Sequence, residues 1–157
     1  MEKKKMVKEI KNISSAVAHL KNDYIAISNI IDVLIDTRKN GNTVYVCGNG
    51  GSASTSTHLV CDLSKTSNIK GICLNDNIAL NTALVNDISW ECIYTYRLKQ
   101  LAKKGDVLIL MSTFGAGYEG SHSSNLRNAV DYANANGITT IGFSGGDGGY
   151  CRRYTLP

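Results

Sequence analysis

Apolar residues recur at helical spacing over the first forty residues of the chain. The positions that repeat every three or four residues are Ile10, Ile13, Val17, Leu20, Ile27, Ile30, Ile31, Leu34 and Ile35. This spacing predicts a helical arm over residues 7–38, with a break at residues 22–23. We expect one face of the arm to pack on its own domain and another on a partner subunit. The alternative is that the arm covers only its own sheet.

Beyond the arm, short apolar runs alternate with amphipathic stretches. The runs predict strands over residues 43–47, 70–74, 107–112 and 139–143, and the stretches predict helices over residues 52–64, 78–84, 90–103 and 125–136. We expect Ser124 to cap the last helix and Gly137 to end it. This alternation predicts a doubly wound parallel sheet in a three-layer α/β/α sandwich. The expected organisation is one domain, with the arm at residues 1–40, the α/β core at 41–149 and a short tail at 150–157.

Composition and charge narrow the class of protein. Of 157 residues, 43% are hydrophobic and 19% are charged, which argues against disorder. The net charge of +4 comes without a block of basic and aromatic residues, so a small anion is a better expected ligand than nucleic acid. The apolar runs are too short to span a bilayer, and no apolar signal core follows the basic start. Five widely spaced cysteines favour reduced thiols, so we expect a cytoplasmic protein.

Two of the predicted strands end in glycines and hydroxyl-bearing residues. The first runs into the glycine-rich corner of residues 48–52 and then a helix, where Ser54, Thr55 and Ser56 add hydroxyls; the third ends in Ser112 and Thr113. Glycines let a ligand approach the backbone, and amides at a helix start attract anions. Both loops follow carboxyl ends of parallel strands, where ligands bind in such sheets. The pair therefore predicts one pocket for a phosphate monoester held without metal; a tight turn with a capping serine is the alternative.

These motifs, in this order, resemble the sugar isomerase (SIS) domain. The stretches that carry the resemblance are GNGGSASTSTHLVCDL, VNDISWE, GDVLILMST and GITTIGFSGGDGG. The phosphoheptose isomerases of this family resemble the chain from the arm to about Gly149. The resemblance implies a flavodoxin-like fold and the interconversion of sedoheptulose 7-phosphate and D-glycero-D-manno-heptose 7-phosphate. It also implies a homotetramer with active sites between subunits.

The resemblance implies roles for individual residues. Substrate-binding positions are expected at Asn49, Gly50, Gly51, Ser52, Ser112 and Thr113, and the extended loop after the third strand adds Ser121 and Ser124 as our own expectation. Asp62 would move the proton between adjacent carbons through an enediol. His58 would polarise or orient the substrate, and Asp87 would contact sugar hydroxyls or set the site.

Several family members bind zinc, so the resemblance makes a zinc ion a candidate here, but we expect no tight zinc site, and the residues themselves require no cofactor. His58 and Asp62 are four residues apart, so they share one face of a helix and could bind a metal together. Catalytic zinc takes three protein ligands, and the third would come from Cys61 or His122. A buried histidine hydrogen-bonded to an aspartate is the alternative role for the pair.

The chain departs from the family pattern near the proposed chemistry. Asp62 stands where the family has glutamate, and a retraction of about 1 Å could cost on the order of a hundredfold in rate. The family continues past Gly149 with a strand and a long helix that carries a glutamine and the acid–base histidine, and the tail at residues 150–157 matches neither.

The loop after the third strand also departs from the family. Residues 112–117 read STFGAG where the family has serine-threonine-serine-glycine-asparagine-serine. We expect Ser121, Ser123 or Ser124 to return the lost hydroxyls, and His122 to lie at the pocket.

Two functions follow from these patterns. The first is a phosphosugar isomerase acting on sedoheptulose 7-phosphate or on a different phosphosugar. The alternative is a non-catalytic SIS scaffold, or a sugar-phosphate-sensing module, that binds a protein partner. Outside the motifs, Trp90 and Tyr94 are expected in the core, and Asp147 is expected to turn the chain rather than to close the pocket edge.

Overall fold

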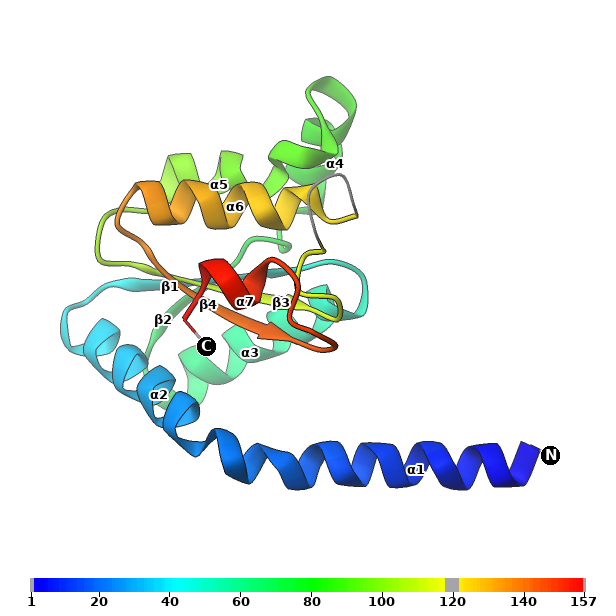
Figure 1. Cartoon of the computed structure of the whole chain (residues 1–157). Helices are drawn as coiled ribbons and strands as arrows, with labels where there is room; N and C mark the ends of the chain where they lie inside the picture. The colour runs from blue at the N-terminus through cyan, green and yellow to red at the C-terminus, as the bar shows by residue number, and fades with distance from the viewer. Residues whose placement is uncertain (1, 118–121, 157) are drawn as a thin grey trace. The chain divides into compact units, whose positions relative to one another are not determined.

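The computed structural model describes residues 2–117 and 122–156, and the described residues form a parallel sheet with helices on both faces (Figure 1). The strands are β1 (Thr43–Gly48), β2 (Lys70–Cys73), β3 (Val107–Ser112) and β4 (Thr139–Ser144). Their order across the sheet is β2-β1-β3-β4, and every pair is parallel. The predicted three-layer, doubly wound fold is confirmed.

The central strands are buried on both faces. All six residues of β1 and the first four of β3 are buried. Helices cover both sides of a parallel sheet, so its strands need no alternation of apolar and polar residues. In the register of the sheet, Val46 of β1 lies between Cys73 of β2 and Ile109 of β3.

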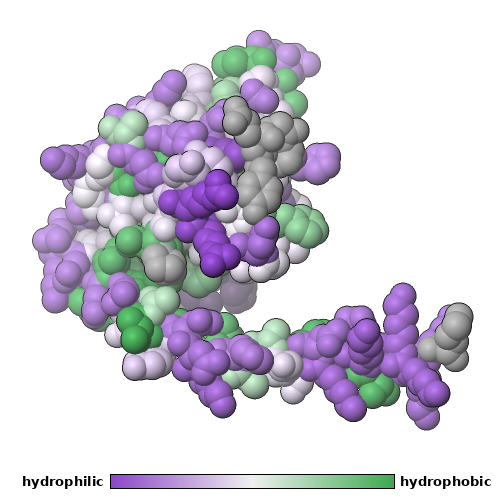
Figure 2. All heavy atoms as spheres, viewed as in Figure 1, coloured by the Kyte–Doolittle hydropathy of each residue, from purple (hydrophilic) through white to green (hydrophobic). Residues whose placement is uncertain are grey.

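The helices form the two outer layers. One layer is α3 (Gly51–Ser67), which packs against β1, β2 and β3 (Figure 1). The other layer contains α5 (Ile93–Leu101) and α6 (Ser124–Ala135), and α4 (Ile78–Asp87) and the 3₁₀ turn η2 (Trp90–Cys92) lie on the same side. Tyr45 and Leu108 of the sheet pack with Leu98 of α5 and Ala129 of α6 in the main core. Apolar side chains also gather on the surface of α4 (Figure 2), where Ile78, Val85 and Ile88 are exposed.

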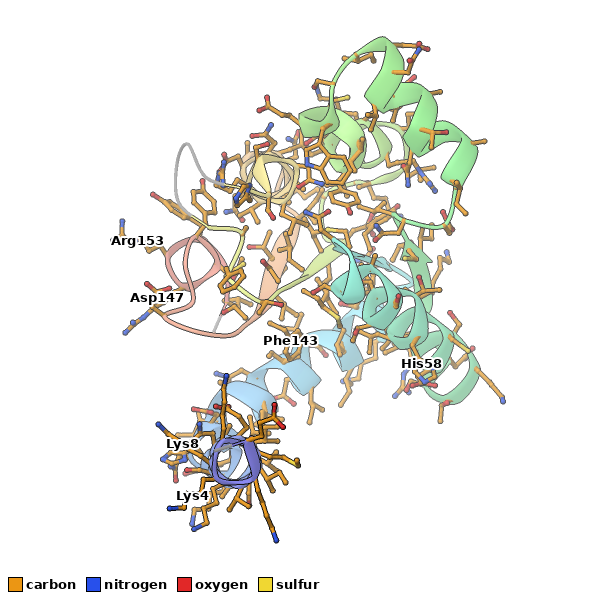
Figure 3. The ribbon with its side chains drawn as sticks, turned by 90° about the vertical axis from the view of Figure 1, so that its right-hand side faces the viewer. Lys4, Lys8, His58, Phe143, Asp147 and Arg153 are labelled. Atoms are coloured by element: carbon orange, nitrogen blue, oxygen red, sulfur yellow. The ribbon has the colours of Figure 1, made fainter. Side chains whose placement is uncertain are left out.

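The N-terminal arm belongs to a separate compact unit that ends at Val33, and the second unit begins at Leu34. The first unit holds α1 (Glu2–His19), the 3₁₀ turn η1 (Leu20–Asp23) and the start of α2 (Tyr24–Lys39), so the predicted break falls within η1. Large apolar side chains are exposed along it at alternating spacings of four and three: Met6, Ile10, Ile13, Val17, Leu20, Tyr24, Ile27 and Ile31. Lys4 and Lys8 project together from one side of α1 (Figure 3). None of the described helices is long and apolar enough to cross a bilayer.

The tail forms an element that the sequence did not predict. A short helix, α7 (Cys151–Tyr154), packs against β4, and the rings of Tyr150 and Tyr154 stack with centroids 4.2 Å apart. The Leu156 amide then donates to the Thr140 carbonyl at 2.8 Å, and Leu156 pairs in parallel with β4. The last described residues therefore extend the sheet beyond its β4 edge.

Two local expectations are wrong. The residue at the N-cap of α6 is Ser123, with a φ of 70°, and Ser124 is already helical. Trp90 is 46% exposed, whereas Tyr94 is fully buried as expected. Gly137 does end α6, with a φ of 68°. The five cysteines are free thiols, although Cys61 is exposed.

Candidate functional site

A cavity of about 450 Å³ lies at the carboxyl ends of β1, β3 and β4. The β1–α3 loop lines it with Asn49 and Ser52, and the β4–α7 loop lines it with Asp147. The end of β3 and the loop after it contribute Met111, Ser112, Thr113, Phe114 and Gly117, and the start of α6 contributes His122, Ser123 and Leu126. The strand order reverses between β1 and β3, and open α/β sheets bind ligands at such a switch point.

The structure brings four of the predicted substrate-binding residues to this cavity. They are Asn49, Ser52, Ser112 and Thr113, from two loops that lie sixty residues apart in the sequence. Gly50 and Gly51 precede Ser52 at the start of α3, and Ser124 begins α6, but these three are not in the cavity wall. Ser121 lies outside the described residues. Asp147 lines the cavity, so its loop forms the pocket edge as well as a turn.

Sequence reasoning missed the apolar part of the wall. Met111, Phe114 and Leu126 line the cavity beside the hydroxyls, and Phe114 is 77% exposed. Met111 and Phe114 could have been predicted from the sequence, because they directly flank Ser112 and Thr113, which were already expected at the site. Small-molecule sites are mostly apolar with a few placed polar groups, and this wall has that character.

The glycine corner lets α3 begin close to the sheet. A Cβ on Gly48 would lie 2.8 Å from the backbone carbonyl of Ser52, so this approach requires glycine. The amides of Ser52 and Ala53 donate to the carbonyls of Asn49 and Gly50, both at 3.0 Å. These two amides are therefore already engaged, and the corner presents the side chains of Asn49 and Ser52 to the cavity.

Two further hydroxyls of this helix do not serve the cavity as predicted. Thr55 Oγ1 donates to the Gly51 carbonyl at 3.2 Å, and Ser56 Oγ donates to the Ser52 carbonyl at 2.8 Å. Serine and threonine inside a helix often bond the carbonyl four residues earlier, which is what both do here. Neither side chain lines the cavity.

Asn49 is held in place by a buried network. Its Oδ1 accepts from the Tyr94 hydroxyl and from Asn125 Nδ2, both at 2.9 Å, and its Nδ2 donates to Asn125 Oδ1 at 3.0 Å and to Ser123 Oγ at 3.3 Å. Burial raises the pKa of Tyr94 well above its ordinary value, so the phenol remains a donor. Both amide hydrogens of Asn49 are thus engaged, and a ligand would have to replace the Ser123 contact to reach them.

The loop after β3 contains a left-handed turn. Gly115, Ala116 and Gly117 have consecutive φ values of 58°, 65° and 66°. The amide of Ala116 donates to Ser112 Oγ at 2.7 Å, which leaves the Ser112 hydroxyl hydrogen to donate to a ligand. This turn sets the direction in which Ser112 and its neighbours meet the cavity.

The first residues of the tail hydrogen-bond to this turn. The amides of Tyr150 and Cys151 donate to the carbonyls of Gly117 and Gly115, both at 3.0 Å. A Cβ on Gly115 would overlap the carbonyl of Gly148, so the two loops approach as closely as a glycine allows. The loop after β3 and the segment just before α7 are therefore packed directly against each other.

The electrostatic character of the wall comes from a few side chains. Among the described lining residues, Asp147 carries the negative charge, His122 adds an imidazole, and lysine and arginine are absent. The hydroxyls of Ser52, Ser112 and Thr113 are neutral donors that an anion would meet there.

The expected catalytic pair lies elsewhere on α3. His58 Nε2 and Asp62 Oδ2 are 3.5 Å apart, and their side chains are 79% and 59% exposed. The two residues sit about 9 Å and 15 Å beyond Ser52 along the helix axis, on a different face. Figure 3 shows His58 and Asp147, which lines the cavity, on opposite sides of the view. Asp87 ends α4, is exposed and accepts from Asn86 Nδ2 at 2.8 Å. Within a single chain, these three residues therefore do not line the cavity.

The described residues do not fit the zinc centre that the resemblance implies. Within residues 2–117 and 122–156, no three histidine, cysteine, aspartate or glutamate side chains are placed to hold a metal ion. His58 and Asp62 supply two ligands, whereas catalytic zinc takes three from protein.

Comparisons with known proteins give a consistent result. The sequence model of the SIS domain family matches residues 6–145. The phosphoheptose isomerase of Aliarcobacter butzleri is 38% identical over 122 residues, which cover 74% of this chain and 61% of that protein. The enzyme of the same name from Clostridium acetobutylicum is 38% identical over 133 residues, with coverages of 82% and 65%. The chain thus spans less than two thirds of the length of these relatives.

Solved structures show the same fold. The phosphoheptose isomerase of Neisseria gonorrhoeae superposes with a TM-score of 0.84 at 22% identity, covering 98% of this chain and 80% of that one. A phosphoheptose isomerase from Francisella tularensis gives a TM-score of 0.86 at 24% identity, with coverages of 99% and 80%.

Proposed function

Because the chain belongs to the SIS domain family, we propose that its cavity binds a sugar phosphate and that the protein is an aldose–ketose isomerase. The proposed reaction converts sedoheptulose 7-phosphate into D-glycero-D-manno-heptose 7-phosphate through an enediol, in line with the name of its 38% identical relatives. The observation that carries the proposal is that Ser52, Ser112 and Thr113 line one cavity at the switch point of the sheet.

The phosphate would be held by neutral donors. The Ser112 hydroxyl retains its hydrogen for a ligand, and Ser52 and Thr113 face the same space from two different loops. Hydrogen bonds to an ionised acceptor are roughly twice as strong as neutral ones, so several hydroxyls can hold a dianion without a metal.

Proton transfer is assigned to the pair on α3. Asp62 would carry the proton between the two carbons, His58 would orient the substrate, and Asp87 would contact its hydroxyls. All three are exposed, and none of them lines the cavity of the same chain. The proposal therefore includes a homo-oligomer, a tetramer by resemblance, in which these residues face a ligand at a subunit boundary. We place it in the cytoplasm with a sugar phosphate as ligand, and we expect neither nucleic acid nor membrane as a partner.

The test is an isomerase assay on the purified chain with sedoheptulose 7-phosphate. Wild type should form aldose, and Asp62→Asn should reduce turnover at least a hundredfold while phosphate binding stays intact. Thr66→Ala, on the exposed surface of the same helix, is the matched control and should keep full activity. Wild-type turnover no greater than that of Asp62→Asn would reject the enzymatic proposal.

A non-catalytic sugar-phosphate-binding module is the second candidate. The exposed His58–Asp62 pair, outside the cavity wall, favours it, because a binding module needs the cavity but not a base. Calorimetry separates the two functions, since binding of the sugar phosphate without turnover supports the module. A different phosphosugar as substrate is a variant of the first proposal. It is favoured by Phe114, which presents a ring where the family pattern has a hydroxyl.

A further inference from the structure

The first turn of α6 bonds to both loops that form the cavity. Asn125 is fully buried and Arg127 is 8% exposed, and neither side chain lines the cavity itself. Leu126, between them, does line it. This turn thus presents one residue to the cavity and a buried polar side chain on each side of it.

Asn125 fixes the loop after β1. Its amide and the amide of Asn49 donate to each other's oxygen, at 2.9 Å and 3.0 Å. Asn125 Oδ1 also accepts from the Leu126 amide at 2.9 Å, which ties the pair to the start of the helix. A reciprocal amide pair sets both the distance between its partners and their orientation, because each bond restrains the other. The position of Asn49 relative to α6 is therefore determined by this pair.

Arg127 fixes the loop after β3. Its Nη1 donates to the Ala116 carbonyl at 2.7 Å and to the His122 carbonyl at 3.0 Å. Ala116 is the middle residue of the left-handed turn, and its carbonyl is buried. A charged donor makes stronger hydrogen bonds than a neutral one, so this contact opposes relaxation of a turn that an alanine adopts only under strain. Arg127 thus holds the turn that directs Ser112 toward the cavity.

We propose that Asn125 and Arg127 are positioning residues that hold the two phosphate-binding loops at a fixed separation. The proposal rests on the proposed function as far as the ligand is concerned, because the loops matter through the phosphate they bind. Their role is to keep Ser52 on one loop and Ser112 and Thr113 on the other within reach of the same anion. Neither residue needs to touch the ligand.

The experiment compares each residue with a matched control. Arg127→Met removes the donor, and Arg127→Lys keeps the charge on a shorter side chain. Arg97→Met is the control, because Arg97 is 9% exposed and pairs with Asp76 at 3.0 Å away from the cavity. For the loop after β1, Asn125→Ala is compared with Asn134→Ala. Asn134 lies at the far end of the same helix, where its Nδ2 donates to the Tyr154 carbonyl at 2.9 Å.

Two readouts are measured on each variant of the 157-residue chain. Calorimetry gives the dissociation constants of inorganic phosphate and of sedoheptulose 7-phosphate. Amide hydrogen exchange gives the local opening of Ala116 and Gly117 for the Arg127 variants, and of Ser52 and Ala53 for Asn125→Ala, with no ligand present. Thermal midpoints show whether each variant and its control lose the same stability.

The expected results follow from the geometry. Arg127→Met and Asn125→Ala should weaken the binding of both ligands by about ten- to a hundredfold, which is what the loss of one hydrogen bond to a charged group costs. Arg127→Lys should retain part of the affinity, and both controls should stay within about twofold of wild type. Exchange should accelerate at least about tenfold in the loop that each variant releases.

Contrary results would overturn the proposal. If Arg97→Met weakens the ligands as much as Arg127→Met at equal thermal midpoint, global stability explains the effect and the positioning role fails. If wild type binds neither ligand, the proposed function fails, and amide hydrogen exchange alone tests whether Asn125 and Arg127 position the two loops. Unchanged exchange rates in the variants would then reject the positioning role.

Discussion

The contact between the β3 loop and the β4–α7 loop can be tested by adding one methyl group. Gly115→Ala places a Cβ where the Gly148 carbonyl already lies, at a φ of 58°. Gly41→Ala is the matched substitution, because Gly41 has a φ of 65° in an open turn with no atom within 4 Å of the added carbon. The two variants share the backbone strain and differ in the steric contact.

The expected cost differs accordingly. An alanine in the left-handed region costs roughly 1–2 kcal/mol, less about 0.4–1 kcal/mol that alanine returns by restricting the unfolded chain. Gly41→Ala should therefore lower the free energy of unfolding by about 0–1.6 kcal/mol. Gly115→Ala adds an overpacking cost of about 1–3 kcal/mol, so its total is about 1–4.6 kcal/mol. Since domains are stable by about 5–15 kcal/mol, the variant should still fold.

The assay is urea unfolding of both variants, followed by phosphate calorimetry. Relief of the overlap must separate the turn from Gly148, so phosphate affinity should fall by up to about a hundredfold for Gly115→Ala, the cost of one lost hydrogen bond to a charged group. Gly41→Ala should bind phosphate like wild type. Equal losses of stability in the two variants, with equal phosphate affinity, would show that the close approach of these loops does not shape the cavity.

Three further predictions concern other parts of the molecule. Asp147→Asn should tighten phosphate binding by about two- to tenfold at low salt, because it removes a negative charge from the cavity wall, and unchanged calorimetric affinity would contradict this. Burial, and next the charge of Asp106, raises the pKa of Tyr45 to about 12 from 10.0, so its contribution to stability is complete below pH 10 and is lost as pH rises to 12. Between pH 10 and pH 12, the free energy of unfolding of Tyr45→Phe should fall less steeply than that of wild type, by up to about 1.4 kcal/mol per pH unit. Parallel curves of unfolding free energy against pH would show that Tyr45 is not the group responsible. Exposed apolar residues at spacings of four and three predict a coiled-coil seam, so Ile13→Asp with Val17→Asp should lower the oligomer mass measured by light scattering, whereas Lys8→Asp should not.

The sheet was predictable because its signals are local. The run from Val107 to Met111 is apolar at every position and lies between Asp106 and Ser112, so a buried parallel strand was the simplest interpretation. Gly137, just past the end of α6, has a positive φ, which is where a helix end favours glycine. The two hydroxyl-bearing strand ends could be placed together, since parallel strands end at one edge of the sheet.

Other features depended on tertiary contacts that no local pattern records. Tyr150 and Cys151 gain their role by donating to a turn that lies more than thirty residues earlier in the sequence. Ser123, whose backbone is left-handed with a φ of 70°, is the N-cap in place of Ser124. Asn125 and Arg127 read as ordinary helix residues in the sequence, and their partners Asn49 and Ala116 come from two other loops.

The His58–Asp62 pair shows where a spacing argument stops. Four residues along a helix guarantee a shared face, and the observed separation of 3.5 Å confirms that the two side chains lie together. The spacing does not say which face the sheet covers, and that choice is set by Ser56 and Leu63, which are the buried residues of α3. The pair therefore faces outward in one chain, as the apolar seam of α1 does in its own unit. Covering the exposed isoleucines would lower the free energy, and an exposed base does little chemistry in open water, so a single assembly step would give both features a function.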